Sequence, residues 1–269
     1  MQNPNITVHM IVKNEDQWVY YALMSILPYA HKILLTDTGS TDNTVSLIKS
    51  IHSPKILYEK VACDTREKVS AVRQKQIEKT QTPWIWVVDG DEIYTEVGAK
   101  EVVQAVASDK FKIIVVRRYD LLGDVYHKQV SSVGAYNLFG AKGHLLVRLI
   151  NKDLISGLNV RGSYPQEGYY DGEGNSVLET PRDDVYITDK SLYHAMYLTR
   201  SSRGANLRSV FNRSKYKIEK GLSIADDLPS VFSLPSPLPG LNPAKRRGFV
   251  YETLATFITP IKNLKRRLL

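Results

Sequence analysis

The feature that most constrains the fold is an alternation of short apolar runs and helical segments over the first 94 residues. The apolar runs do not alternate with polar residues, which indicates strands buried on both faces, and helices between such strands cover a parallel sheet. The runs are Ile6–Val12, Ile33–Thr36, Ile56–Tyr58 and Trp84–Val88, and the helical segments are Trp18–Leu27, Val45–Ile51 and Arg66–Lys79. The sequence therefore predicts an α/β fold with an open, doubly wound, mainly parallel sheet flanked by helices.

The pattern changes after residue 94. We expect a helix over Ala99–Ala107 and strands over Lys112–Tyr119 and Leu145–Ile150, separated by Gly-rich irregular segments of the kind that line binding sites. A polar helix is predicted over Ser201–Lys220, and prolines are frequent after Leu228. We therefore expect one domain over residues 1–227, with halves 1–94 and 95–227, a Pro-rich linker over 228–243 and a tail over 244–269.

The net charge of +8 is concentrated in the tail. Seven basic residues and one acidic residue fall between Lys245 and Leu269, a net +6, which leaves +2 for the rest of the chain. A body so close to neutral argues against a broad nucleic-acid surface. The tail pattern is typical of a helix with one apolar face flanked by Lys and Arg, which favours a membrane surface, although such a face also suits docking on the body or on another subunit. The apolar positions are Val250, Leu254, Phe257, Ile258, Ile261, Leu264 and Leu268.

The chain carries no sign of secretion or of a membrane span. The single cysteine, Cys63, excludes an intrachain disulfide framework and a cysteine-rich zinc site, and is typical of a reducing compartment. The first residues lack the basic and apolar segments of a secretory signal, and no run of 18 apolar residues is present. We therefore expect a cytoplasmic protein, soluble or peripheral on the inner face of the cell membrane.

Acidic residues follow three of the predicted strands. Asp37 follows the second strand, Asp64 follows the third after a short loop, and Asp89-Gly90-Asp91-Glu92 directly follows the fourth. In open α/β sheets ligands bind beyond the carboxyl ends of the strands. Clustered carboxylates at that edge can hold a hard divalent cation that bridges substrate phosphates. The alternative is that these acids cap helices or fill turns, but several acids after one buried strand favour the cation site.

Three segments follow the predicted strands in an order, and at separations, that resemble family 2 glycosyltransferases of the GT-A fold. They are Val12-Lys13-Asn14-Glu15, Asp37-Thr38-Gly39-Ser40-Thr41-Asp42-Asn43-Thr44 and Asp89-Gly90-Asp91-Glu92. The resemblance is specific over Ile6–Tyr94, thinner over Lys112–Leu198 and absent from the tail. It implies transfer of a sugar from a nucleotide-sugar donor, expected to be UDP-linked, usually with inversion and assisted by Mn²⁺ or Mg²⁺. The first half of the domain would bind the donor and the second half the acceptor.

The resemblance also implies roles for individual residues. Glu15 and Asp37 match positions that contact the uridine or ribose, and Asp64 matches an acid that meets the base. Asp91 matches a direct metal ligand, whereas Asp89 matches a position nearer the ribose. Arg73 matches an arginine near the nucleotide, although the next residue is glutamine where asparagine is usual. The expected donor-binding residues are Val12, Glu15, Asp37, Asp64, Arg73, Asp89 and Gly90.

Transfer also requires a base, because the acceptor hydroxyl has a pKa far above 7 and must lose its proton. Our candidate is Glu167, because related enzymes place an acid after a strand here in a His-Glu pair, and Gln166 stands where that histidine would be. Asp171 and Glu173 compete for this role, and the alternative for Glu167 is an ordinary surface loop. His194 resembles the late histidine that supplies a third metal ligand in many GT-A enzymes, but a histidine beside aromatic residues is also common in protein cores.

The function predicted from these residues is that of an inverting, metal-dependent glycosyltransferase. Its acceptor would be a glycan or a lipid-linked envelope intermediate, and its oligomeric state is open. One rival is a sugar nucleotidyltransferase, which would carry a Gly-rich loop after the first strand, whereas the segment there has no glycine. The other rival is a degenerate, non-catalytic domain that binds a nucleotide sugar or scaffolds a membrane complex. The candidate residues Asp89, Asp91, Glu167 and His194 weigh against it.

Overall fold

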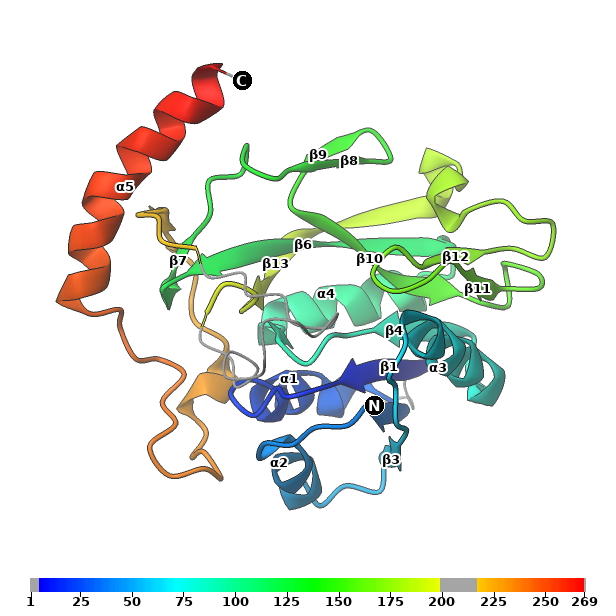
Figure 1. Cartoon of the computed structure of the whole chain (residues 1–269). Helices are drawn as coiled ribbons and strands as arrows, with labels where there is room; N and C mark the ends of the chain where they lie inside the picture. The colour runs from blue at the N-terminus through cyan, green and yellow to red at the C-terminus, as the bar shows by residue number, and fades with distance from the viewer. Residues whose placement is uncertain (1–4, 199–216, 269) are drawn as a thin grey trace.

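The computed structural model describes residues 5–198 and 217–268 (Figure 1). A ten-stranded sheet runs through the molecule in the order β14-β7-β6-β10-β4-β1-β2-β3, with β13 beside β6 and β5 beside β13. Its strands are β1 (Ile6–Val12), β2 (Lys32–Asp37), β3 (Ile56–Lys60), β4 (Trp84–Val87), β5 (Glu92–Ile93), β6 (Ile113–Leu122), β7 (Asp124–Lys128), β10 (Leu145–Asn151), β13 (Val185–His194) and β14 (Leu222–Ser223). Two small sheets pair β8 (Tyr136–Leu138) with β9 (Ala141–Gly143) and β11 (Asn159–Arg161) with β12 (Gly168–Tyr170). The α-helices are α1 (Val19–Ile26), α2 (Thr44–Ser50), α3 (Arg66–Lys79), α4 (Glu96–Ala107) and α5 (Phe249–Leu268).

The strands β3, β2, β1 and β4 are all parallel. In β4, Trp84 and Trp86 pack into the core shared with α1, α2 and α4, whereas Ile85 and Val87 pack into a second core that includes Ile77 of α3. All four β4 residues are 4% exposed or less. A strand buried on both faces has no polar side to alternate with, which explains the uninterrupted apolar runs. The predicted α/β class, with a sheet flanked by helices, is confirmed.

The second half makes the sheet mixed rather than mainly parallel. β10 lies antiparallel beside β4, and β6 lies antiparallel beside β10. β6 therefore runs in the same direction as β4, and β13 runs parallel to β6. As a consequence, the carboxyl ends of β1, β4, β6 and β13 lie along one edge of the sheet. This edge carries the candidate site.

Most predicted elements of the first half are confirmed to within a few residues. Helix α3 has the predicted bounds, and the Thr65 side chain accepts a hydrogen bond from the Lys68 N–H at 3.4 Å, which caps its N-terminus. The helix predicted over Ser201–Lys220 lies mainly outside the described residues. Its described part, Lys217–Lys220, is not helical.

The segment predicted as an extended linker, residues 228–243, packs on the domain instead. It contains a short 3₁₀ helix, Ser230–Ser233, in which Phe232 is 7% exposed. The Phe232 ring meets Trp18 and Tyr21 edge-on, with ring centroids 6.4 Å and 5.7 Å apart. Apolar residues between the prolines bury in a hydrophobic cluster of the domain, which gives this segment a packing role that its prolines do not indicate.

The tail forms the predicted helix, α5, at one end of the molecule (Figure 1). Polar contacts attach it to the segment before β14. The Tyr251 hydroxyl lies 3.0 Å and 3.1 Å from the carbonyl oxygens of Lys217 and Glu219, and the Arg266 guanidinium pairs with the Glu219 carboxylate at 2.8 Å. Tyr251 and Ala255 are the buried residues of α5. The helix therefore docks on the body through a narrow, largely polar strip.

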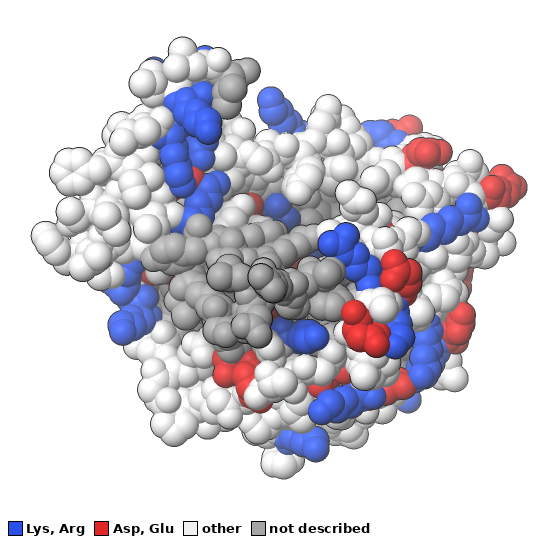
Figure 2. Space-filling view, in the orientation of Figure 1, with Lys and Arg blue, Asp and Glu red and all other residues white. Residues whose placement is uncertain are grey.

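Most of the apolar face predicted for α5 is exposed to solvent. Seven large apolar side chains of this helix are between 43% and 85% exposed: Phe249, Val250, Leu254, Phe257, Ile261, Leu264 and Leu268. Figure 2 shows basic side chains gathered along the same helix, beside a broad uncharged surface. Within the described ranges, no helix is both long and apolar enough to cross a membrane.

Candidate active site at the carboxyl edge of the sheet

The candidate site begins where β4 ends, at Asp89, Gly90 and Asp91. A Cβ atom at Gly90 would lie 3.0 Å from Val12 Cγ1 and 3.3 Å from Glu15 Cγ, closer than most side-chain contacts. Glycine therefore lets the segment after β1 pack directly on the acidic turn after β4. This close packing brings Val12 and Glu15 next to the acidic turn.

The loops after β1 and β2 are tied to each other by hydrogen bonds. The Glu15 N–H donates to Thr44 Oγ1 at 2.7 Å, and the Thr41 N–H donates to the side-chain oxygen of Asn14 at 2.8 Å. Asp37 is fully buried and accepts a hydrogen bond from the Ser40 N–H at 3.1 Å. The Asp37 carboxylate thus shapes the loop that follows its own strand.

Two arginines converge on Asp89. Arg148 Nη2 lies 2.8 Å from Asp89 Oδ2 and also pairs with Glu92, while Arg73 Nη2 lies 4.0 Å from Asp89 Oδ1. Burial alone would raise the pKa of Asp89, but Arg148 and Arg73 outweigh it and hold that pKa below its usual value. For Glu92, burial wins over the attraction of Arg148, so its pKa is raised. Asp89 is therefore held as an anion between two guanidinium groups.

Glu167 joins this cluster from the loop before β12. Its Oε1 accepts a hydrogen bond from Arg73 Nε at 2.9 Å, and its side chain is 8% exposed. Its Oε2 is buried and makes no hydrogen bond within the described part of the chain. The competing acids are placed differently: Asp171 accepts hydrogen bonds from the N–H groups of Gly174 and Asn175 in a turn, and Glu173 is exposed.

His194 lies between two carboxylates at the end of β13. It pairs in register with Glu92 of β5 and with Asp120 of β6. Its Nε2 is 3.4 Å from Asp91 Oδ2, and its Nδ1 is 3.0 Å from Asp120 Oδ1. Burial alone would lower the pKa of His194, but the charge of Asp91 and the hydrogen bond to Asp120 together raise it to about 9.

The described residues supply only part of a ligand set for a divalent cation. Among the residues that the structure describes, no group of three or more His, Cys, Asp or Glu side chains could hold a metal ion. Asp91 and His194 do offer a carboxylate oxygen and a ring nitrogen 3.4 Å apart. Mg²⁺ in particular is usually held by one or two protein carboxylates, with waters and substrate phosphates completing the shell. The pair therefore fits a cation that arrives with a diphosphate.

One predicted donor-binding residue stays outside the cluster, and two residues of the cluster were missed. The Asp64 side chain is 72% exposed and pairs with Lys68 at 2.6 Å, at the start of α3. Arg148 was missed, although an arginine inside an apolar strand run signals a buried partner. Asp120 was also not predicted as a site residue. It directly follows the predicted strand Lys112–Tyr119, and ligands bind beyond the carboxyl ends of such strands, so its position was a usable signal.

The chain is similar in sequence to known glycosyltransferases. A family model described as "Glycosyl transferase family 2" matches residues 7–157. The SPbeta prophage-derived glycosyltransferase SunS of Bacillus subtilis (strain 168) is 28% identical over 196 residues, covering 70% of this chain and 45% of SunS. Glycosyltransferase SunS of Bacillus phage SPbeta gives the same values. The chain thus spans less than half the length of these relatives.

Solved structures show a more distant likeness. S. aureus TarS 1-349 in complex with UDP-GlcNAc has 9% identity and a TM-score of 0.46, covering 70% of this chain and 57% of that one. Glucosyl-3-phosphoglycerate synthase from Mycobacterium tuberculosis, in complex with Mn²⁺ and UDP-Glc, has 14% identity and a TM-score of 0.45, covering 70% of each chain. Similarity at this level does not extend a substrate or a metal to this chain. The family model, in contrast, matches more than half of the 269 residues, and the chain belongs to glycosyl transferase family 2.

Proposed function

We propose that this glycosyltransferase moves a sugar from a UDP-sugar to an acceptor hydroxyl, with inversion and with help from Mn²⁺ or Mg²⁺. The observation that carries the proposal is the cluster at the carboxyl edge, where buried charges from both halves of the chain converge. The donor nucleotide, UDP, is the one that the resemblance to family 2 glycosyltransferases implies.

The charge balance of the cluster supports a requirement for a cation. It contains four carboxyl groups, from Asp89, Asp91, Glu92 and Glu167, and three basic groups, from Arg73, Arg148 and His194. A diphosphate would add negative charge to a set that already has more acids than bases. A divalent cation would neutralise the charge that develops on the diphosphate as the sugar leaves. Asp91 and His194 would hold that cation, and Arg148 would fix the Asp89 carboxylate beside the donor.

Glu167 is suited to act as the base. Arg73 holds its Oε1, so the carboxylate has one orientation, while Oε2 makes no hydrogen bond to any other described residue. In the proposed step the acceptor oxygen bonds to the anomeric carbon, the bond from that carbon to the diphosphate oxygen breaks, and the acceptor proton passes to Glu167. Attack on the face opposite the leaving group gives inversion. A positioned base of this kind contributes about 10²–10⁴ in rate.

We further propose that α5 meets an anionic membrane surface, which would bring the enzyme to a lipid-linked or envelope glycan acceptor. The exposed apolar face of the helix and its basic residues supply the two interactions that interfacial helices use. Each basic side chain near an anionic surface contributes about 1 kcal/mol, and this contribution fades beyond the Debye length. Binding to anionic vesicles should therefore weaken as salt rises, whereas salt-insensitive binding would contradict the electrostatic part.

The test of the catalytic proposal is UDP release from a panel of UDP-sugars, with Mn²⁺, with Mg²⁺ and with EDTA. We expect release from at least one donor, strongly reduced by EDTA. Full activity in EDTA would refute the proposed requirement for a metal ion. Release of pyrophosphate from UTP and a sugar phosphate would instead identify a nucleotidyltransferase, and donor binding without turnover would identify a scaffold.

A further inference from the structure

Asp120 stands directly behind His194, on the side away from Asp91. It is the β6 residue in register with His194 of β13, and it is 2% exposed. Its Oδ1 accepts a hydrogen bond from His194 Nδ1 at 3.0 Å. Because the two strands are adjacent and parallel, this contact is set by the sheet and not by a loop.

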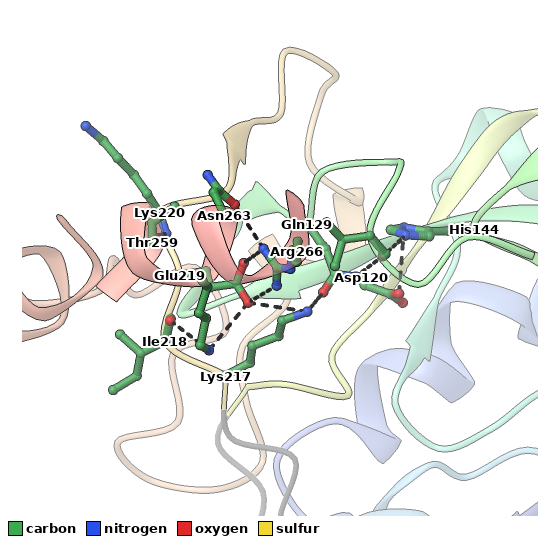
Figure 3. Close-up of polar contacts among 12 residues, drawn as sticks. Asp120, Gln129, His144, Lys217, Ile218, Glu219, Lys220, Thr259, Asn263 and Arg266 are labelled. Carbon is green, nitrogen blue, oxygen red and sulfur yellow. Dashed lines mark hydrogen bonds and ion pairs between the residues drawn. The ribbon is translucent and has the colours of Figure 1, made fainter. Parts of the chain in front are cut away.

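The Asp120 carboxylate is itself held in place. Arg118 Nε lies 2.9 Å from Oδ1, and His144 Nδ1 lies 3.7 Å from Oδ2. The backbone carbonyl of Asp120 accepts a hydrogen bond from the Gln129 N–H at 2.8 Å. Figure 3 shows Asp120 beside His144, with Gln129 in contact with Lys217. The carboxylate therefore has little freedom to turn away from the imidazole.

A carboxylate on one ring nitrogen determines what the other nitrogen can do. With Nδ1 donating to Asp120, Nε2 is the nitrogen that faces Asp91, 3.4 Å from Oδ2. Carboxylates placed behind ligating histidines fix the ring orientation and raise the basicity of the ligating nitrogen. The arrangement Asp120–His194–Asp91 has this form, and it joins β6, β13 and the turn after β4, which are far apart in the sequence.

We infer that Asp120 is a positioning residue that aims His194 Nε2 at the cation held with Asp91. The inference rests on the proposed function, since it requires that Asp91 and His194 bind a divalent cation. Asp120 touches neither donor nor cation in this scheme. It acts only through His194, so its effect must disappear when the His194 ring is absent.

The experiment measures the affinity of the full chain for Mn²⁺ in the presence of UDP, by electron paramagnetic resonance of free Mn²⁺. Loss of such a supporting carboxylate typically costs about 10–100-fold in metal affinity. We expect a loss of Mn²⁺ affinity near the upper end of this range for Asp120→Ala. The loss should be near the lower end for Asp120→Asn, because its amide oxygen can still accept a hydrogen bond from His194 Nδ1. Affinity within about twofold of wild type in the Asn variant, or in a folded Ala variant, would overturn the inference.

A matched control is available in the neighbouring strand. Asp124 of β7 is 3% exposed and accepts from His127 Nδ1 at 2.7 Å, so it is a second Asp–His pair with a buried carboxylate, and both of its residues lie on β7. Asp124→Asn should leave the Mn²⁺ affinity near that of wild type. An equal loss in both Asn variants would show a general structural effect and would overturn the role of Asp120.

A double-mutant cycle with His194→Ala completes the test. In the His194→Ala background, Asp120→Asn should cost no further affinity, whereas an undiminished additional loss would overturn the inference. Failure of the proposed function looks different, because wild-type protein would then show no Mn²⁺ binding with UDP. The near-isosteric Asn substitution, checked by its thermal unfolding midpoint, keeps the test valid if the Ala variant does not fold.

Discussion

The carboxyl edge of the sheet and helix α5 depart from the usual distribution of residues in opposite ways. At the edge, charged groups such as Asp91, Glu92 and Asp120 are 3% exposed or less, whereas on α5 Phe257 and Ile261 are 70% and 69% exposed. Buried charges and exposed apolar patches are the informative exceptions in a folded protein, since neither stabilises an isolated monomer. Buried charge at the edge and exposed apolar area on the helix are the two observations on which the proposals of catalysis and of membrane contact rest.

The largest expected effect comes from Asp91→Asn. A neutral amide is a poorer ligand for a hard cation, so transfer should be nearly abolished, a loss of about 10⁴-fold or more, equivalent to about 5 kcal/mol or more of transition-state stabilisation. The fold should survive, because the carboxylate lies at the site and not in the apolar core, although loss of the buried pair with His194 should lower the free energy of unfolding. Steady-state kinetics and thermal unfolding measure the two quantities. Wild-type turnover in this variant would remove Asp91 from the site.

Glu167→Gln should lower transfer by about 10²–10⁴-fold, because the amide keeps the shape of the side chain but cannot take the acceptor proton. Donor affinity, measured by calorimetry with the UDP-sugar, should stay within a few-fold. Asp171→Asn and Glu173→Gln are the comparison variants. If one of them is the inactive variant and Glu167→Gln is not, the base has been assigned to the wrong acid.

On α5, Phe257→Ser combined with Ile261→Ser should abolish sedimentation with anionic liposomes at low salt. The same variant should keep donor turnover in solution. Its free energy of unfolding should differ from that of wild type by no more than about 0.5 kcal/mol per substitution, because both side chains are exposed. An inactive or unfolded variant would mean that this face is covered by protein, and full retention on liposomes would exclude it as the membrane contact.

The smallest effect concerns the docking of α5 through Glu219. Burial alone would raise the pKa of Glu219, but Arg266, Lys217 and Lys262 outweigh it and lower that pKa. Ionised Glu219 therefore favours docking above the ordinary glutamate pKa, and this contribution is lost as pH falls through the lowered pKa of the folded state. The protection factors of the α5 amides, which correct for the slower intrinsic exchange at low pH, should fall at acid pH in wild type. Glu219→Gln should exchange faster already at neutral pH, and equal protection in both proteins would exclude this contact as an anchor.

Much of the first half could be predicted because its signals are local. The apolar run of β4 and the acids that follow it lie within nine residues, Trp84–Glu92, so one short segment indicates both a buried strand and a site. Val12 and Asp37 are the last residues of β1 and β2, and Glu15 follows β1 by three residues. The open α/β class follows from strand and helix periods that each element carries by itself.

The sequence by itself thus determined the alternation of elements, the acidic turn after β4 and the helical, basic tail. Only the tertiary structure decided that β10 lies antiparallel between β4 and β6, which brings Arg148 to Asp89, and that β13 lies beside β6, which places Asp120 behind His194. It also decided that residues 228–243 pack on α1 and that α5 docks through Glu219. The physical reason is that strand pairing and charge pairing between distant segments depend on which surfaces remain to be covered once the local elements have formed, and no local period records that choice.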